Sequence, residues 1–154
     1  MTHFLGTHQN RLDAKGRVSV PAPFRAALRD GAEATGALIL RPSFKHPCVE
    51  AWPGPEFHSL AAPLNRLDLF SEEHDDLAST LYAEAFPADI DKEGRIVLPD
   101  ALIAHAGLHD AVVFMGLGRI FQIWEPLAAE RRRAEARERA RARGLTLPGA
   151  GGGP

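Results

Sequence analysis

Hydrophobic and polar residues alternate in two short stretches of this chain, and each stretch ends at a proline. In RVSV, residues 17–20, the two valines face one way and the arginine and serine the other, as in a β-strand with one buried face. RIVL at 95–98 has the same pattern. Pro21 and Pro99 end these strands because proline cannot donate to a strand ladder. The pattern predicts two half-buried strands in equivalent positions.

Alanine- and leucine-rich segments follow both strands and predict short helices that end at Gly31 and Gly107. Between the two strand–helix units, leucines recur at helical spacing and Ser71 is followed by two glutamates, a helix-start signal. We predict two helices there, the first broken near Pro63. The segment from residue 127 predicts a helix with almost no apolar face, and its glycine-rich end predicts disorder.

The two strands belong to an internal repeat with a spacing of 78 residues, because DAKGRVSVP begins at Asp13 and DKEGRIVLP begins at Asp91. An aspartate at the start of a turn accepts hydrogen bonds from nearby amides. Gly16 and Gly94 supply the positive φ that closes a short hairpin with a bulge. Each half, about 45 residues, is too small to bury enough apolar area alone. The repeat therefore predicts one shared β core with pseudo-twofold symmetry.

The charge distribution separates the chain into three parts, although the net charge is only −2. Residues 11–29 carry five basic side chains and one acid, residues 56–91 carry nine acids and one base, and residues 130–143 carry seven arginines and three glutamates. Local charge decides where an anion docks. A polyanion would therefore meet the first part or the tail, and for the tail a solvated helix with internal Glu–Arg pairs is the favoured interpretation.

The two copies of the repeat differ mainly in charge. Arg11, Lys15 and Arg25 of the first copy correspond to Asp89, Glu93 and Ile103 of the second. Features kept in both copies are interpreted as structural, namely Asp13, Gly16 and Pro21 with Asp91, Gly94, Arg95 and Pro99. The three cations of the first copy would form a basic patch on the hairpin tip and its flanks, and a two-stranded ribbon fits the DNA major groove. Arg17 recurs as Arg95, so an ion pair with its own aspartate and a DNA contact both remain open for it. Each cation taken alone could be an ordinary solvated charge.

No motif in the sequence indicates a catalytic site. His105 and His109 have a metal-binding spacing, but the glycine between them indicates a helix end and no third ligand is near. GLG at 116–118 predicts a hairpin turn rather than a nucleotide-binding loop, and Cys48 is interpreted as a small buried side chain. No run of apolar residues is long enough for a membrane span, and the first residues lack a signal-peptide pattern. We therefore expect a cytosolic non-enzyme with no cofactor, metal, membrane contact or small-molecule substrate.

Four segments occur in an order that is specific to one family: FLGTHQNRLDAKGRVSVPAPFRAAL, HPCVEAWP, DKEGRIVLPDALIAHAGL and GRIFQIWEP. They closely resemble MraZ, a family of bacterial transcriptional regulators. The resemblance implies a mixed α+β, mainly β fold. In it, two pseudo-symmetric SpoVT-AbrB-type motifs form one swapped-hairpin core, with helices between the halves and a C-terminal helical tail. The first motif would span 7–54 and face DNA, the helical connector 55–82, the second motif 83–126, used for packing and oligomerisation, and the Arg-rich tail 127–154.

The resemblance also implies a function. Members of this family bind tandem direct repeats of double-stranded DNA in the promoter of the division and cell-wall gene cluster, which includes their own gene, and are generally repressors. They associate with the nucleoid and form homo-oligomeric rings. The D-x-x-x-R loop that faces DNA corresponds here to Lys15 and Arg17, with Arg11 near, while Glu93 makes the second loop a poorer DNA contact. The alternative is an antitoxin-like or scaffold protein whose basic loop binds an acidic partner.

Overall fold

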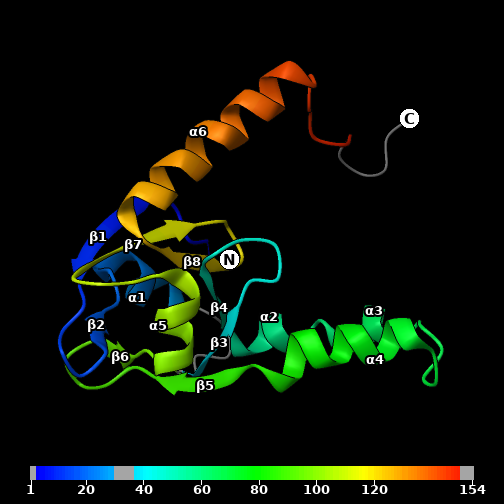
Figure 1. Ribbon diagram of the computed structural model, residues 1–154, viewed down its shortest axis with the longest axis horizontal. Coiled ribbons are helices and arrows are strands. Elements are labelled where there is room, and N and C mark those ends of the chain that lie inside the picture. Colours follow the sequence, from blue (N-terminus) through cyan, green and yellow to red (C-terminus); the bar gives the residue numbers. More distant parts are fainter. Residues whose placement is uncertain (1–2, 30–36, 150–154) are drawn as a thin grey trace.

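The computed structural model describes residues 3–29 and 37–149, and the two repeats fold with the same order of elements (Figure 1). The first repeat contains β1 (Thr7–Arg11), β2 (Arg17–Ser19), α1 (Ala22–Arg29), β3 (Ala37–Pro42) and β4 (Val49–Pro53). The second contains β5 (Phe86–Asp89), β6 (Arg95–Val97), α5 (Asp100–Ala106), β7 (Ala111–Gly116) and β8 (Phe121–Trp124). The predicted α+β fold with two equivalent halves is confirmed.

Six strands form one antiparallel sheet in the order β1-β7-β8-β4-β3-β5. Replacing each strand by its counterpart in the other half gives the same order read backwards, so a pseudo-twofold axis passes between β8 and β4. The first strand of each half lies against the other half, since β1 pairs with β7 and β5 pairs with β3. Neither half can complete its part of the sheet without the other.

The prediction that each repeat forms its own two-stranded hairpin is wrong about which strands pair. The chain does reverse after β1, but the only β-bridge between the two segments joins Leu12, just after β1, to Val18. β2 instead pairs with β6 of the other half, in a separate antiparallel ribbon centred on Val18 and Ile96. Turn residues fix a local reversal, whereas the choice of partner strand depends on burial across the whole core. We call this two-stranded unit the ribbon.

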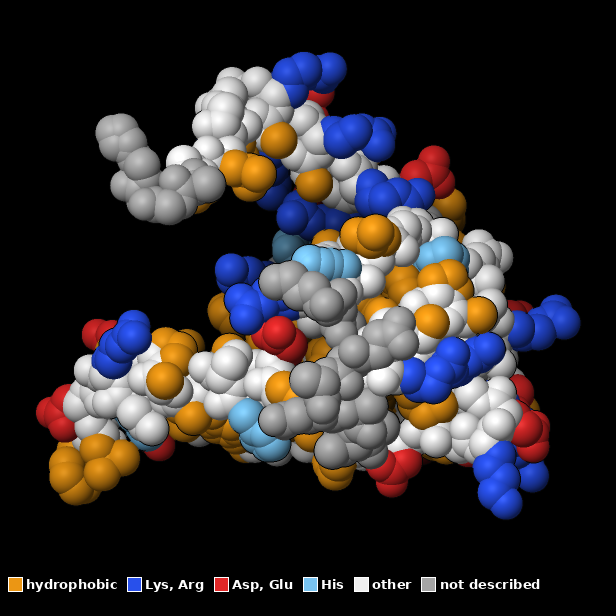
Figure 2. Space-filling view, turned by 180° about the vertical axis from the view of Figure 1, so that it is seen from behind, with side chains coloured by type: hydrophobic (Ala, Val, Ile, Leu, Met, Phe, Trp, Pro, Cys, Tyr) orange, Lys and Arg blue, Asp and Glu red, His pale blue; other side chains and the backbone are white. Residues whose placement is uncertain are grey.

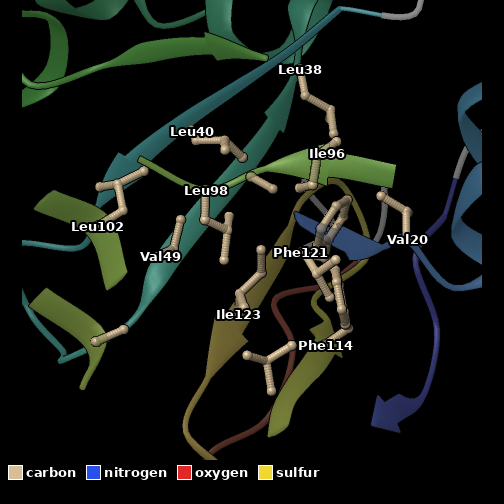
Figure 3. Close-up of a cluster of buried hydrophobic side chains, with 14 of the residues drawn as sticks. Val20, Leu38, Leu40, Val49, Ile96, Leu98, Leu102, Phe114, Phe121 and Ile123 are labelled. Atoms are coloured by element: carbon tan, nitrogen blue, oxygen red, sulfur yellow. The ribbon is translucent and has the colours of Figure 1, made fainter. Parts of the chain in front are cut away.

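The core is built from both halves (Figure 3). Side chains from the first repeat, among them Val20, Leu38 and Leu40, point toward side chains from the second, such as Leu98 and Phe121. All five are at most 1% exposed. The alternation predicted for residues 17–20 is confirmed, because the two valines are buried while the arginine and serine are not. Sharing one apolar interior between two small halves supplies burial that each lacks alone.

Two helical projections leave this core. The connector folds as α2 (Gly54–His58), α3 (Ala61–Leu64), α4 (Glu72–Ala78) and a π-helical turn at Ser79–Ala83, which together form an arm (Figure 1). The predicted break in the first helix lies at 59–60, just before Pro63, and Ser71 caps α4 by accepting from the His74 amide at 3.1 Å. α6 (Pro126–Ala142) extends from another part of the body. No helix in the described residues is both long and apolar enough to cross a membrane.

A buried ion pair that the sequence analysis missed anchors the arm to the sheet. Arg41 on β3 is 2% exposed, and its Nε donates to the Glu50 carboxylate on β4 at 3.0 Å. Its Nη1 donates to the Thr80 carbonyl of the π-helical turn at 2.9 Å. The arm is therefore fixed at its base through one guanidinium. The predicted helix stop at Gly31 and the glycine-rich end lie outside the described residues, whereas Gly107 ends α5 with φ +61° as predicted.

Candidate nucleic-acid interface

The loop at residues 13–16, here called loop 1, is held by one aspartate. Oδ1 of Asp13 accepts from the backbone amides of Lys15 at 2.9 Å and Arg17 at 2.8 Å, and Oδ2 accepts from Arg17 Nε at 2.7 Å. These hydrogen bonds, foremost the one from the Arg17 amide, hold the pKa of the Asp13 carboxyl below its usual value. The carboxylate is thus committed to shaping the turn. Both interpretations of Arg17 stay compatible, because only its Nε is used.

Loop 2, residues 91–94, repeats this geometry. Oδ1 of Asp91 accepts from the amides of Glu93 and Arg95 at 2.9 Å each, and Oδ2 accepts from Arg95 Nε at 3.1 Å. The Arg95 amide is the main cause of the lowered pKa of Asp91. Two loops of different charge therefore have the same backbone and the same aspartate–arginine pair. The two loops differ in their remaining side chains.

The tip residue decides whether the arginine is available to a ligand. In loop 2, Glu93 forms a second ion pair with Nη2 of Arg95 at 3.2 Å. In loop 1 the tip residue is the exposed Lys15, and within the described residues neither its Nζ nor the Nη atoms of Arg17 make an ion pair or hydrogen bond. Loop 1 consequently presents the ammonium group of Lys15 and the free Nη atoms of Arg17, whose Nε is paired with Asp13. In loop 2, Glu93 also occupies Nη2 of Arg95.

The ribbon sets both arginines on one solvent-facing surface. Val18 and Ile96 of its central pair are each 1% exposed, so the flanking residues point outward. Ser19 lies opposite Arg95, and Arg17 lies opposite Val97, which is 57% exposed. Loops 1 and 2 therefore lie at opposite ends of one short ribbon. Backbone bonds from Val20 to Gly94 (2.9 Å) and from Leu98 to Gly16 (2.7 Å) attach each loop to the other half.

Arg25 is not brought to loop 1. It lies on α1 beside loop 2, where its Nη1 donates to the Val20 carbonyl at 2.6 Å. A methyl group added at Gly94 would meet the Arg25 side chain at 2.8 Å, so the guanidinium packs directly on the second loop. Its counterpart Ile103 packs on Gly16 in the same way, with Cδ1 at 3.6 Å. Positions 25 and 103 are equivalent in the repeat, and each packs on the loop glycine of the other copy. This equivalence is the sequence signal that could have revealed the contact.

Arg11 lies on a flank of the ribbon. It is the last residue of β1 and is exposed, two positions before loop 1. Its neighbour Asn10 points toward the ribbon, where its Nδ2 donates to the Ser19 carbonyl at 2.6 Å. Successive strand residues point to opposite faces, so Arg11 projects from the other face of the sheet. Lys15 and Arg17 thus form the centre of the candidate interface and Arg11 its edge.

The other residues weighed for chemistry lie in structural positions. Cys48 is fully buried, and burial raises the pKa of its thiol to about 12, as the interpretation of a small buried side chain requires. His105 Nε2 lies 3.2 Å from the His46 carbonyl. Within residues 3–29 and 37–149, no group of three or more His, Cys, Asp or Glu side chains could hold a metal ion. The predicted turn at GLG is confirmed between β7 and β8.

Comparison with known proteins gives a consistent match over nearly the whole chain. A family model described as "MraZ protein, putative antitoxin-like" matches residues 3–79 and 81–143. The second matched segment extends through α6, beyond the motif that ends at Pro126. A protein of Gluconacetobacter diazotrophicus named "Transcriptional regulator MraZ" is 66% identical over 98% of this chain and 95% of its own length. Proteins of the same name from Gluconobacter oxydans and Xanthobacter autotrophicus are 63% and 43% identical, each over 92% of this chain and over 87% and 88% of their own lengths.

Proposed function

The chain belongs to the MraZ family, and from this premise we propose that it is a transcriptional regulator that binds double-stranded DNA through loop 1. The observation that carries the proposal is the contrast between the two loops. They share one backbone geometry, yet Lys15 leaves the Nη atoms of Arg17 free, whereas Glu93 pairs with those of Arg95 at 3.2 Å. An unpaired lysine beside an arginine whose Nη atoms are free suits a polyanion.

The shape of the ribbon supports the same partner. A two-stranded ribbon is narrow enough to enter the major groove, where arginine or lysine can recognise guanine edges. Lys15 and Arg17 are the candidates for base contact, and Arg11 on the flank is a candidate for phosphate contact. Arg25 would act indirectly, because it is hydrogen-bonded to Val20 and packs on loop 2. The proposed DNA-contact surface is therefore small.

A DNA-contact surface this small binds weakly unless several copies of the protein engage the DNA together. Two or three cations per copy give a log–log salt slope of only about −1.8 to −2.7. We propose that several copies form a homo-oligomeric ring and engage tandem direct repeats together, which raises avidity about 10²- to 10⁴-fold when the spacing matches. The proposed target is the promoter of its own gene and of the division and cell-wall cluster. The expected effect is repression in the cytoplasm, at the nucleoid.

Titration of the full-length protein with its own upstream DNA tests this function. We expect much tighter binding to DNA with several direct repeats than to DNA with one repeat, at matched length and salt. The affinity for several repeats should fall steeply with salt. Equal affinity for both DNAs would remove the avidity argument, and no salt-dependent binding to either would overturn the proposed function.

A second candidate is supported by the words "antitoxin-like" in the matching family description. In it, the basic loop 1 binds an acidic protein partner instead of DNA. Purification after nuclease treatment separates the two functions. An acidic protein that stays bound through Lys15 and Arg17, with no retained DNA, would favour this candidate over the first.

A further inference from the structure

The tip of the arm exposes an aromatic side chain that the proposed DNA contact does not use. Phe70 is 91% exposed and Leu69 is 64% exposed, on the turn between α3 and α4. The turn is ordered by hydrogen bonds, since the Phe70 amide donates to Asp68 Oδ1 at 3.1 Å and the Ser71 hydroxyl to the Asp68 carbonyl at 2.7 Å. Hydrophobic side chains gather at the end of this arm in Figure 2. A fixed exposed aromatic is typical of an interaction site.

Acidic side chains surround this apolar tip. Between residues 66 and 76 there are five acids and one arginine, a net charge of −4. The acids are Asp68, Glu72, Glu73, Asp75 and Asp76. Within the described residues none of them takes part in an ion pair, although other acids of the chain do. The arm therefore offers an apolar contact inside an uncompensated negative field.

A groove of opposite character lies beside α6. It has a volume of about 400 Å³ and is lined by Met115 and Leu117 from the β7 end and by Arg132, Arg133 and Arg137 from α6. Arg132 is paired with Glu135 at 3.4 Å, while Arg133 and Arg137 have no ion pair among the residues described. Residues 130–143 hold seven arginines and three glutamates, a net charge of +4. None of the groove's lining residues comes from the arm of the same chain.

We propose that the arm tip of one copy docks in the α6 groove of the next copy, with Phe70 against Met115 and Leu117 and the acids against Arg133 and Arg137. The inference rests on the assembly of several copies proposed above and names its contact. The segments that carry the two surfaces have complementary net charges, −4 for residues 66–76 and +4 for residues 130–143. The arm and α6 project from the body with open space between them (Figure 2), and the groove lies where α6 meets the body, so one copy can use both surfaces at once. Two different surfaces make a head-to-tail contact, which closes into a ring when the rotation between copies permits it.

Two full-length variants isolate the two surfaces. The arm variant combines Phe70→Ala with Glu72→Gln and Glu73→Gln, and the groove variant combines Arg133→Glu with Arg137→Glu. Leu147→Ala is the matched control, since Leu147 is also 91% exposed but belongs to neither surface. All substituted side chains are solvent-accessible, and circular dichroism checks that each variant is folded.

Native mass spectrometry of each variant and of their equimolar mixture gives the decisive result. We expect the wild type and the control to form particles larger than one 16.7 kDa chain, and each variant alone to be monomeric. The mixture should contain a two-chain particle and nothing larger, because only the intact arm of one variant fits the intact groove of the other. Variants that keep the wild-type mass, or a mixture that stays monomeric, would overturn the inference.

DNA with a single repeat separates this inference from the proposed function. Both variants should bind it as the wild type does, because loop 1 is unchanged. A groove variant that keeps its mass but loses single-repeat binding would assign α6 to DNA and overturn the docking. If the wild type does not bind DNA, that result would instead contradict the proposed function, whatever the particle mass.

Discussion

The substitution Lys15→Glu places in loop 1 the residue type that loop 2 has at the equivalent position, Glu93. The structure of loop 2 therefore shows the expected effect of the substitution. Glu93 pairs with Arg95 Nη2 at 3.2 Å while its aspartate keeps the same three hydrogen bonds, at 2.9 to 3.1 Å. A glutamate at position 15 should therefore neutralise Arg17 without changing the turn. The fold should be retained, and the charge of Lys15 and the free Nη atoms of Arg17 should be lost together.

The size of the effect follows from these two cations. Removing two DNA-facing positive charges per copy makes the log–log salt slope less steep by about 1.8. Losing one good bidentate base contact costs about 1–3 kcal/mol, which is about 5- to 150-fold in Kd for each engaged copy. Several copies on tandem repeats multiply this loss. Promoter binding should therefore be abolished at moderate salt.

Fluorescence anisotropy with promoter DNA over a range of salt concentrations measures both quantities, and thermal unfolding checks the fold. Glu93→Lys is the matched reverse variant, and it should retain or strengthen binding because it frees Arg95. Lys15→Gln removes one charge without creating a new pair, so its loss should be intermediate. A folded Lys15→Glu protein with wild-type affinity and salt slope would refute the assignment of loop 1 to DNA.

Three further predictions concern the scaffold. Gly16→Ala should lower the melting temperature more than Gly94→Ala, because the new methyl meets a backbone carbonyl at 2.9 Å in loop 1 and a flexible side chain at 2.8 Å in loop 2; an equal shift would contradict this packing. Arg41→Met should cost up to about 3–5 kcal/mol in urea unfolding, because it leaves the largely buried Glu50 without its cationic partner and with the Trp52 hydrogen bond alone; a cost below about 1 kcal/mol would show that the anchor is dispensable. The lowered pKa values of Asp13 and Asp91 imply stability that is present above the ordinary aspartate pKa of about 4 and lost as the pH falls below it. Melting curves between pH 6 and pH 2 should accordingly be flatter for the Asp13→Asn/Asp91→Asn double variant, and parallel curves would contradict the assignment.

Local features of the fold were predictable because they depend on neighbours in the sequence. The aspartate and glycine of each loop determine the turn, and alternation determines which residues of β2 are buried. The partner of β2 was not predictable in this way, since its pairing with β6 depends on packing between segments about 78 residues apart. The resemblance implied a swapped core, whereas the local pattern by itself gave a simple hairpin.

The same distinction between local and long-range features applies to the candidate site. Comparing the two copies identified the difference between Lys15 and Glu93, and the structure adds that this difference determines whether the arginine of the loop is paired. The position of Arg25 was missed because its contact with loop 2 crosses between halves. Arg41 was missed because a single arginine in an apolar strand gives no periodic signal, and only the register of β3 and β4 places it opposite Glu50.

Hydrogen–deuterium exchange of the full-length protein, with and without promoter DNA, tests the central claim that one of two equivalent loops binds DNA. Each loop serves as the internal control for the other, because their backbone hydrogen bonds match. DNA should slow exchange at the amides of residues 15–17 and leave those of residues 93–95 unchanged. Equal protection of both loops, or protection of the second loop alone, would contradict the account.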